Sequence, residues 1–320
     1  MHLVIGAGEF LAGHVTRALA AEEVPVIELQ ADADPETLAD AVSGVEVVVF
    51  CAQTVSPARK LRYRKRPPAV LQRVLEAARN ARIRRLIHVS TADVYGPDHF
   101  ARVTERSPLK PAHAYERIKL YEEEWLLAAA ADEVEVVIIR PARVFGEGED
   151  WIVPRLVSAV VRGRVWLPQG GEAKQTFVAA EDVGRACLAA SDRGRPGHRY
   201  LVGGFDSTWR EFVISAARAA GFAAETGSIP YDLYFLRAVA LETFTPLNSV
   251  IWPGRYALDV LGKPHQYDDS HSRRELTWSP SIGSFEQQMP AMTRWLTRLP
   301  EVASAIAAAD QAGATSPPGR

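Results

Sequence analysis

The segment that decides the fold is His2-Leu3-Val4-Ile5-Gly6-Ala7-Gly8-Glu9-Phe10-Leu11-Ala12-Gly13, at the start of the chain. Residues 2–5 read as a buried strand, and a helical pattern runs from Glu9 to Ala21. Glycines between a strand and a helix allow a tight turn and let a pyrophosphate rest on the helix N-terminus. The segment therefore predicts a dinucleotide-binding turn, with a plain strand-to-helix turn as the alternative.

The first half of the chain alternates short, apolar, β-branched runs with helical patterns. The predicted strands are 2–5, 24–29, 45–50, 85–89 and 134–139, and the predicted helices are 9–21, 34–42, 68–81 and 115–131. Such alternation is typical of a parallel sheet with helices on both faces. We therefore predict an α/β fold with a Rossmann-type, doubly wound parallel sheet, which binds ligands at the carboxyl ends of its strands.

The second half of the chain is less regular and holds most of the tryptophans. Helices are predicted at 151–162, 181–191 and 208–220, and strands at 175–179 and 200–202. We assign residues 1–146 with about 175–203 to the dinucleotide-binding domain, and about 147–174 with 204–300 to a smaller, mixed, C-terminal substrate-binding lobe. Residues 304–320 are rich in Ala, Gly, Ser and Pro, which predicts a flexible tail.

Composition places the chain among ordinary globular proteins. It has 320 residues, of which 47% are apolar and 24% charged, and a formal net charge of -2. So small a charge gives no reason to expect a nucleic acid partner. Cys51 and Cys187 lack the spacing of a zinc site and fit a reducing compartment, so we expect no metal. With no signal peptide and no membrane span in the sequence, we expect a cytoplasmic protein with a small-molecule substrate.

Hydroxyl side chains follow the predicted strand 85–89. Ser90 and Thr91 stand at its carboxyl end in the run His88-Val89-Ser90-Thr91-Ala92-Asp93-Val94-Tyr95-Gly96. Tyr115 and Lys119 lie four residues apart on a predicted helix and therefore share a face. A nearby ammonium lowers the pKa of a phenol, which would let Tyr115 act as general acid or base near pH 7. We predict a catalytic centre of Tyr115 and Lys119, with a hydroxyl of Thr91 or Ser90 to hold the reacting oxygen; an exposed helix pair is the alternative.

These motifs together resemble an extended short-chain dehydrogenase/reductase of the NAD-dependent epimerase/dehydratase family. The resemblance covers residues 1 to about 298. Besides the glycine turn, the hydroxyl run and Tyr115/Lys119, its markers are Ile139-Arg140-Pro141-Ala142-Arg143-Val144-Phe145-Gly146, Phe177-Val178-Ala179-Ala180-Glu181-Asp182-Val183 and Glu275-Leu276-Thr277-Trp278-Ser279-Pro280.

The resemblance implies a set of functional residues and a nicotinamide cofactor, NAD or NADP. It gives the chemistry to Tyr115 and Lys119, with Thr91 matching the third hydroxyl position better than Ser90. The implied cofactor-binding residues are Gly6, Gly8, Glu9, Phe10, Leu11, Gln30, Asp32, Cys51, Ala52, Gln53, Val89, Tyr115, Lys119, Arg140, Pro141 and Val144. The implied substrate contacts are Thr91, Ala92, Asp93, Tyr115, Arg143 and Gln175. It also implies a homodimer, formed through the predicted helices 68–81 and 115–131.

The chain departs from the family pattern at four places. Glu9 and Ala12 stand where the second and third glycines are expected, and one strand before residue 45 is missing. Both departures weaken the expected cofactor binding. Pro67 replaces an Asn, and Gln175 replaces the Arg that many members use for a nucleotide-sugar diphosphate. The end of the second predicted strand offers acids and Gln30 but no Arg, which slightly favours NAD over NADP.

Two further segments are unusual. Residues 59–66, Arg-Lys-Leu-Arg-Tyr-Arg-Lys-Arg, form a basic run that is either a solvated loop or a site for an anionic group. Residues 231–244 form an apolar helical pattern that is either core or subunit packing, or a lid over a hydrophobic substrate.

The sequence as a whole predicts an NAD(P)-dependent oxidoreductase that interconverts a ketone and an alcohol in a fairly apolar molecule. One alternative is a nucleotide-sugar epimerase or dehydratase. Another is a degenerate family member that binds a ligand without turnover or performs non-redox acid–base chemistry, a hypothesis motivated by Glu9 and the missing strand.

Overall fold

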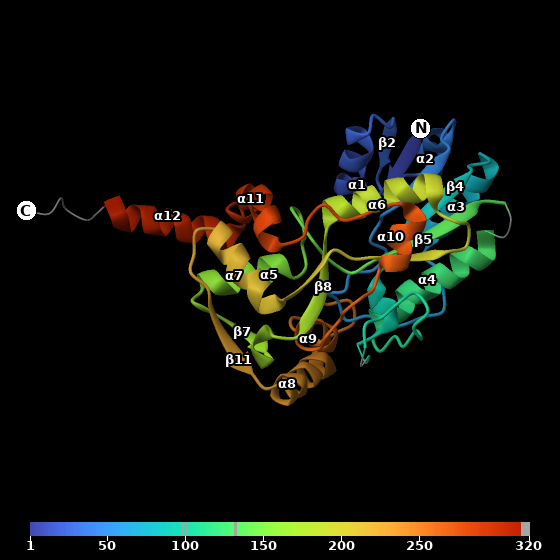
Figure 1. Ribbon diagram of the computed structural model, residues 1–320. Coiled ribbons are helices and arrows are strands. Elements are labelled where there is room, and N and C mark those ends of the chain that lie inside the picture. Colours follow the sequence, from blue (N-terminus) through green and yellow to red (C-terminus); the bar gives the residue numbers. More distant parts are fainter. Residues whose placement is uncertain (98, 100, 131–132, 315–320) are drawn as a thin grey trace, which may run out of the picture.

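The computed structural model describes residues 1–97, 99, 101–130 and 133–314 and is built around a six-stranded sheet (Figure 1). The strand order is β2-β1-β3-β4-β5-β9, and every neighbouring pair is parallel. The strands are β1 (His2–Ile5), β2 (Val26–Leu29), β3 (Val47–Phe50), β4 (Arg85–Val89), β5 (Glu135–Pro141) and β9 (Arg199–Val202). The edge strand β2 is followed only by a helix before β3, in agreement with the missing strand.

Helices cover both faces of this sheet. One face packs against α1 (Phe10–Ala21) and α6 (Ala180–Arg193), which contact each other closely. The other face packs against α2 (Pro35–Val42), α3 (Ala69–Asn80) and α4 (Ala114–Ala130). The sheet can be covered on both sides because its strands are apolar throughout, as in Val47–Phe50. The prediction of a Rossmann-type α/β fold is confirmed.

The second lobe is mixed and has an aromatic core. It holds a three-stranded sheet of order β10-β8-β6 and a two-stranded sheet of β11 and β7. Rings of Phe145, Phe177, Phe205, Phe212 and Phe285 pack together at its centre. Its elements are β6 (Arg143–Phe145), α5 (Val153–Val161), β7 (Arg164–Pro168), η2 (Gln169–Gly171), β8 (Lys174–Ala179), β10 (Phe205–Thr208), α7 (Trp209–Ala219), β11 (Glu225–Ile229), α8 (Tyr231–Phe244), α9 (Arg255–Gly262), α11 (Phe285–Leu296) and α12 (Pro300–Ala314). Helix α10 (Ser270–Leu276) instead packs against α6 and β9 of the large sheet.

Two boundaries differ from the sequence prediction. Strands β6 and β8 pair with each other in the small sheet, whereas the sequence placed both segments in the dinucleotide-binding domain. Helix α12 occupies 300–314, where the sequence predicted a flexible tail from residue 304; residues 315–320 lie outside the described part. Within the described residues, no helix is both long and apolar enough to cross a membrane.

Candidate active site

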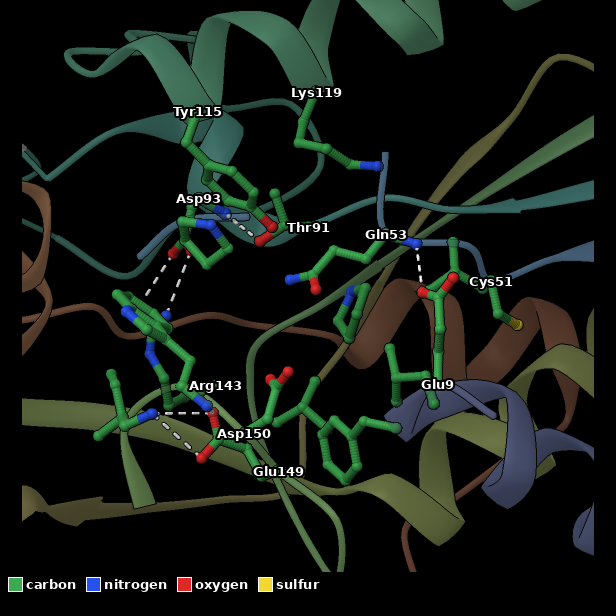
Figure 2. A pocket seen from close by; sticks show the side chains of 18 of the residues that line it. Glu9, Cys51, Gln53, Thr91, Asp93, Tyr115, Lys119, Arg143, Glu149 and Asp150 are labelled. Atoms are coloured by element: carbon green, nitrogen blue, oxygen red, sulfur yellow. Dashed lines mark hydrogen bonds and ion pairs between the residues drawn. The ribbon is translucent and has the colours of Figure 1, made fainter. Parts of the chain in front are cut away.

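A cavity of about 380 Å³ lies at the carboxyl ends of β1, β3, β4 and β5, between the sheet and the second lobe (Figure 2). Parallel strands all end at this edge, so loops far apart in sequence meet there. The predicted site residues that line the cavity are Gly8, Glu9, Phe10, Leu11, Cys51, Ala52, Gln53, Val89, Ser90, Thr91, Asp93, Tyr115, Lys119, Pro141, Arg143 and Val144.

The glycine turn after β1 has the geometry of a phosphate-binding turn, with one exception. Gly6 has φ 120°, and a Cβ there would lie 3.1 Å from the backbone nitrogen of Ala52, so only glycine allows this close approach. Glu9 stands at the N-terminus of α1, and its Oε2 accepts the backbone N–H of Gln53 at 2.5 Å. Burial raises the pKa of this carboxyl, although the Gln53 bond opposes the shift. The turn fits a dinucleotide but carries an acid where a diphosphate would rest.

Tyr115 extends from the first turn of α4 into the cavity (Figure 2). Its ring packs against that of Tyr256, with centroids 5.2 Å apart. Burial raises the pKa of the phenol well above its ordinary value, and the negative charges of Asp93 and Glu122 raise it further. The sequence predicted a lowered pKa for this phenol, and the structure contradicts that prediction.

The partner of Lys119 explains this difference. Its Nζ donates to Oε2 of Glu122 at 2.7 Å, one helical turn along α4. Glu122 is fully buried and also accepts the hydroxyl of Thr54, from the loop after β3. The ring of His88 lies 3.7 Å from the same carboxylate, but burial holds the pKa of His88 well below its ordinary value, so the ring is neutral. Glu122 thus balances the ammonium that was expected to acidify Tyr115.

The two neighbouring hydroxyls at the end of β4 have different surroundings. The hydroxyl of Ser90 donates a hydrogen bond to the carboxylate of Glu123, a buried residue on α4. Thr91 accepts the backbone N–H of Asp93 at 3.1 Å, and its own proton is not used in that bond. Because a hydroxyl has a single proton to donate, Thr91 is better suited than Ser90 to hold a substrate oxygen.

Asp93 and Arg143 form a buried network in the cavity lining. The guanidinium of Arg143 donates to both carboxylate oxygens of Asp93, at 3.0 and 3.2 Å, and Tyr256 donates its hydroxyl at 2.5 Å. Burial alone would raise the pKa of Asp93, but Arg143, with His265 and Tyr256, holds it below its ordinary value. The sequence expected both residues to contact substrate; the structure pairs them with each other.

Besides Gly6, which packs against the backbone of Ala52, five predicted residues lie outside the cavity lining. Arg140 is buried, donates to Glu123 and Tyr95, and therefore points into the protein rather than toward a cofactor. Gln175 is also buried and donates to the backbone carbonyl of Lys263, because β8 belongs to the small sheet. Ala92 is packed in the core. Gln30 and Asp32 are exposed beyond β2, outside the cavity lining. We remove the first three from the candidate site.

The sequence missed the wall of the cavity that the second lobe supplies. Trp151 and Tyr256 stack with centroids 5.2 Å apart, and Trp209 completes an aromatic surface. Glu149 lines the same region and accepts three backbone N–H groups at the start of α5, which fixes the loop that carries Trp151. The abundance of tryptophan in this half was the only signal, and it does not identify which rings face a ligand.

Comparison with known proteins finds the model of the NAD dependent epimerase/dehydratase family over residues 2–203. A 4-hydroxy-2-methyl-3-oxo-4-farnesyl-3,4-dihydroquinoline-1-oxide ketoreductase of Stigmatella aurantiaca is 28% identical over 262 residues, 77% of this chain and 76% of that protein. Sterol demethylase protein B of Methylococcus capsulatus is 28% identical over 315 residues, 87% of this chain and 93% of that protein. The crystal structure of a dTDP-glucose 4,6-dehydratase from Streptomyces venezuelae with NAD bound has a TM-score of 0.69 at 21% identity. The structural alignment covers 93% of this chain and 97% of the dehydratase chain.

We expect Asp93→Asn to lower the free energy of unfolding by about 3–5 kcal/mol near pH 7, because Arg143 would lose its buried counter-ion. A carboxylate with a lowered pKa stabilises the fold above its unfolded-state pKa and loses this effect as the pH falls through its folded-state pKa. The difference in free energy of unfolding between Asp93→Asn and the wild type should therefore become smaller as the pH is lowered. Urea denaturation at several pH values measures both effects.

The matched control is Glu172→Gln, which breaks an ion pair with Arg210 in which both side chains are about half exposed. This change should cost less than about 1 kcal/mol. If Asp93→Asn were as mild as the control, the pair would not support the fold, and a role in substrate binding would return.

Proposed function

The chain belongs to the NAD-dependent epimerase/dehydratase family, and we propose that it is an NAD(P)-dependent oxidoreductase that reduces a ketone in an apolar small molecule. The observation that carries this proposal is the convergence of Thr91, Tyr115 and Lys119 on one cavity whose opposite wall is aromatic. Two relatives agree with such a substrate, since one is named as the ketoreductase of a farnesylated ketone and the other for a sterol.

The cofactor is proposed to lie along the glycine turn and the loop after β3. Gly6 and Gly8 leave its diphosphate room at the N-terminus of α1, and Cys51, Ala52 and Gln53 form the neighbouring wall. Pro141 and Val144 line the side nearest the second lobe. When bound, the nicotinamide group supplies or takes up the hydride. The absence of an arginine at the end of β2 slightly favours NAD over NADP.

In the proposed reaction Tyr115 is the general acid. Its phenol gives a proton to the carbonyl oxygen while the carbonyl carbon gains a hydride, so the C=O double bond becomes an alcohol. The resulting phenolate recovers a proton from solvent. The hydroxyl of Thr91 would hold the reacting oxygen by donating a hydrogen bond. A raised phenol pKa keeps Tyr115 protonated at neutral pH, which is the form that a general acid for ketone reduction needs.

The charges of the cavity lining argue against the nucleotide-sugar alternative. Two lining residues are basic, and each is already paired, Lys119 with Glu122 and Arg143 with Asp93. Glu9, Glu149 and Asp150 add acidic groups to the same lining. A second diphosphate in this cavity would meet carboxylates without a free cation, which is unfavourable at close range.

We expect Tyr115→Phe to lower kcat for ketone reduction about a hundredfold or more, with little change in KM, because the proton donor is lost. Thr91→Val should also lower kcat. Ser90→Ala is the comparison variant: it removes the bond to Glu123, so it should lower stability and should lower kcat less than Thr91→Val does. The measurement is NADH or NADPH oxidation over a panel of apolar ketones. Wild-type protein that binds the cofactor but reduces none of them would support a ligand-binding protein instead.

We expect Glu122→Gln to move the alkaline limb of the kcat–pH profile toward lower pH by about one unit. Removing this charge lets Lys119 stabilise the phenolate, so the pKa of Tyr115 falls and its acid form is lost earlier as the pH rises. Glu124→Gln, on the exposed side of the same helix, is the control and should leave the profile unchanged. An unshifted profile for Glu122→Gln would show that Glu122 does not tune the phenol.

We expect Glu9→Gln to bind NADH about fivefold more tightly at neutral pH, because the amide can still accept the Gln53 N–H but carries no charge beside the diphosphate. The pKa of Glu9 is raised, so wild-type affinity should rise as the pH falls through that pKa, and the variant should lack this rise. Calorimetry at several pH values tests both points, with the exposed Asp40→Asn on α2 as control. Equal affinities for wild type and variant would mean that Glu9 turns away from the cofactor.

A further inference from the structure

Helix α8 presents a row of apolar side chains to solvent. Leu233, Leu236 and Phe244 are 62%, 66% and 87% exposed, and Ala240 is exposed between them. These positions follow the spacing i, i+3, i+7, i+11, so they form one stripe along the helix. We call these four residues the apolar stripe. A soluble surface normally has few exposed leucines and phenylalanines in a row.

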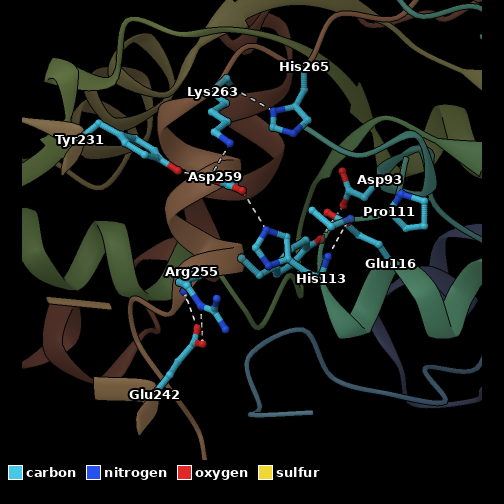
Figure 3. Close-up of polar contacts among 12 residues, drawn as sticks. Asp93, Pro111, His113, Glu116, Tyr231, Glu242, Arg255, Asp259, Lys263 and His265 are labelled. Carbon is cyan, nitrogen blue, oxygen red and sulfur yellow. Dashed lines mark hydrogen bonds and ion pairs between the residues drawn. The ribbon is translucent and has the colours of Figure 1, made fainter. Parts of the chain in front are cut away.

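The opposite face of α8 packs against α9. The helix is therefore held in place, and the apolar stripe is its solvent-facing side. Ala238 is fully buried, and Glu242 accepts the backbone N–H and the Nε of Arg255 at 2.6 and 2.7 Å (Figure 3). The hydroxyl of Tyr231 bonds to Asp259 at the other end of the helix. No residue of α8 lines the cavity, which argues against the lid that its pattern also allowed.

The basic segment, residues 59–66, begins beside the C-terminal end of this helix. Backbone bonds of 2.9 Å join Lys60 N to the carbonyl of Ser249 and Asn248 N to the carbonyl of Lys60. The Nζ of Lys60 donates to the carbonyl oxygens of Glu242 and Thr245 at the end of α8. Leu247 and Val250, more than half exposed, extend the apolar surface toward the segment.

The charges of the basic segment are not neutralised within the described part of the chain. Arg62, Arg64, Lys65 and Arg66 are exposed, and none has an ion pair with another described residue. On α8 itself, Arg237 is a further exposed cation. Of the two acidic residues of α8, Asp232 is exposed and Glu242 is partly buried. An apolar helix face bordered by unpaired cations is the pattern of a protein surface that lies on an anionic bilayer.

We propose that the apolar stripe and the basic segment form one surface that binds anionic phospholipid membranes. The stripe enters the boundary between headgroups and acyl chains, while the arginines and lysines contact lipid phosphates. The surface is close in the chain to the cavity, because Thr54, Val55 and Pro57 line the cavity just before the basic segment begins. The binding does not depend on the proposed reaction, so failure of one leaves the other standing.

The test is cosedimentation of the full chain with vesicles of phosphatidylcholine, with or without phosphatidylserine. Binding is expected only to the vesicles that contain phosphatidylserine, and salt should weaken it. Arg62→Gln with Arg64→Gln should reduce partitioning about thirtyfold, at roughly a factor of five for each cation. Leu236→Glu with Phe244→Glu should abolish it. Absence of binding by the wild type overturns the proposal.

Matched controls distinguish this surface from general charge and apolarity. Arg218→Gln with Arg298→Gln removes two exposed arginines on other elements, and Leu109→Glu changes an exposed leucine elsewhere. These controls should bind vesicles like the wild type; equal losses in controls and surface variants would refute the assignment. Light scattering of Leu236→Glu with Phe244→Glu tests a protein partner instead. The expected homodimer uses α3 and α4, so these substitutions on α8 should leave the oligomeric state unchanged. A change in oligomeric state would assign α8 to a subunit interface and would overturn the proposal.

Discussion

The half of the molecule that holds the candidate active site depends on two consecutive buried glutamates, Glu122 and Glu123, which hold α4 against the sheet. Glu123 pairs with Arg140 of β5 at 2.6 Å and accepts the hydroxyl of Ser90 at the end of β4. Glu122 pairs with Lys119 and accepts the hydroxyl of Thr54 from the loop after β3. Buried carboxylates are costly unless every one of them is paired and hydrogen-bonded. Their bonds therefore fix the register of α4, and with it the position of Tyr115 relative to Thr91.

This arrangement also decides the chemistry that Tyr115 can perform. A lysine four residues away on a helix usually suggests a phenol that ionises easily. Here the ammonium faces a carboxylate instead, and burial together with the charge of Asp93 adds to the cost of a phenolate. A phenol that keeps its proton at neutral pH is in the form that a general acid needs. The protonation state of Tyr115 at neutral pH thus depends in part on Glu122, the helical neighbour that pairs with Lys119.

The sequence predicted the fold and the centre of the site because both depend on short-range rules. Alternating strands and helices imply a parallel sheet, and the carboxyl ends of its strands bring Gly8, Cys51, Thr91 and Pro141 to one edge. Helical spacing places Tyr115 and Lys119 on one face. What the sequence could not predict were partners that lie far away along the chain. Tyr256 reaches Asp93 across 163 positions, and Gln175 turns inward only because β8 pairs with β6 and β10.

The cavity and the basic segment differ in charge, and this difference bears on the proposed substrate. The cavity has acidic groups and no free cation among its lining residues, while the outer basic segment has cations and no described counter-ions. A phosphorylated, water-soluble substrate would be attracted to the outside and repelled within. An uncharged apolar ketone is not repelled by the cavity, gains from its aromatic wall of Trp151, Trp209 and Tyr256, and concentrates in a bilayer. The proposed membrane surface and the proposed ketone are thus consistent on electrostatic grounds, although each rests on its own residues.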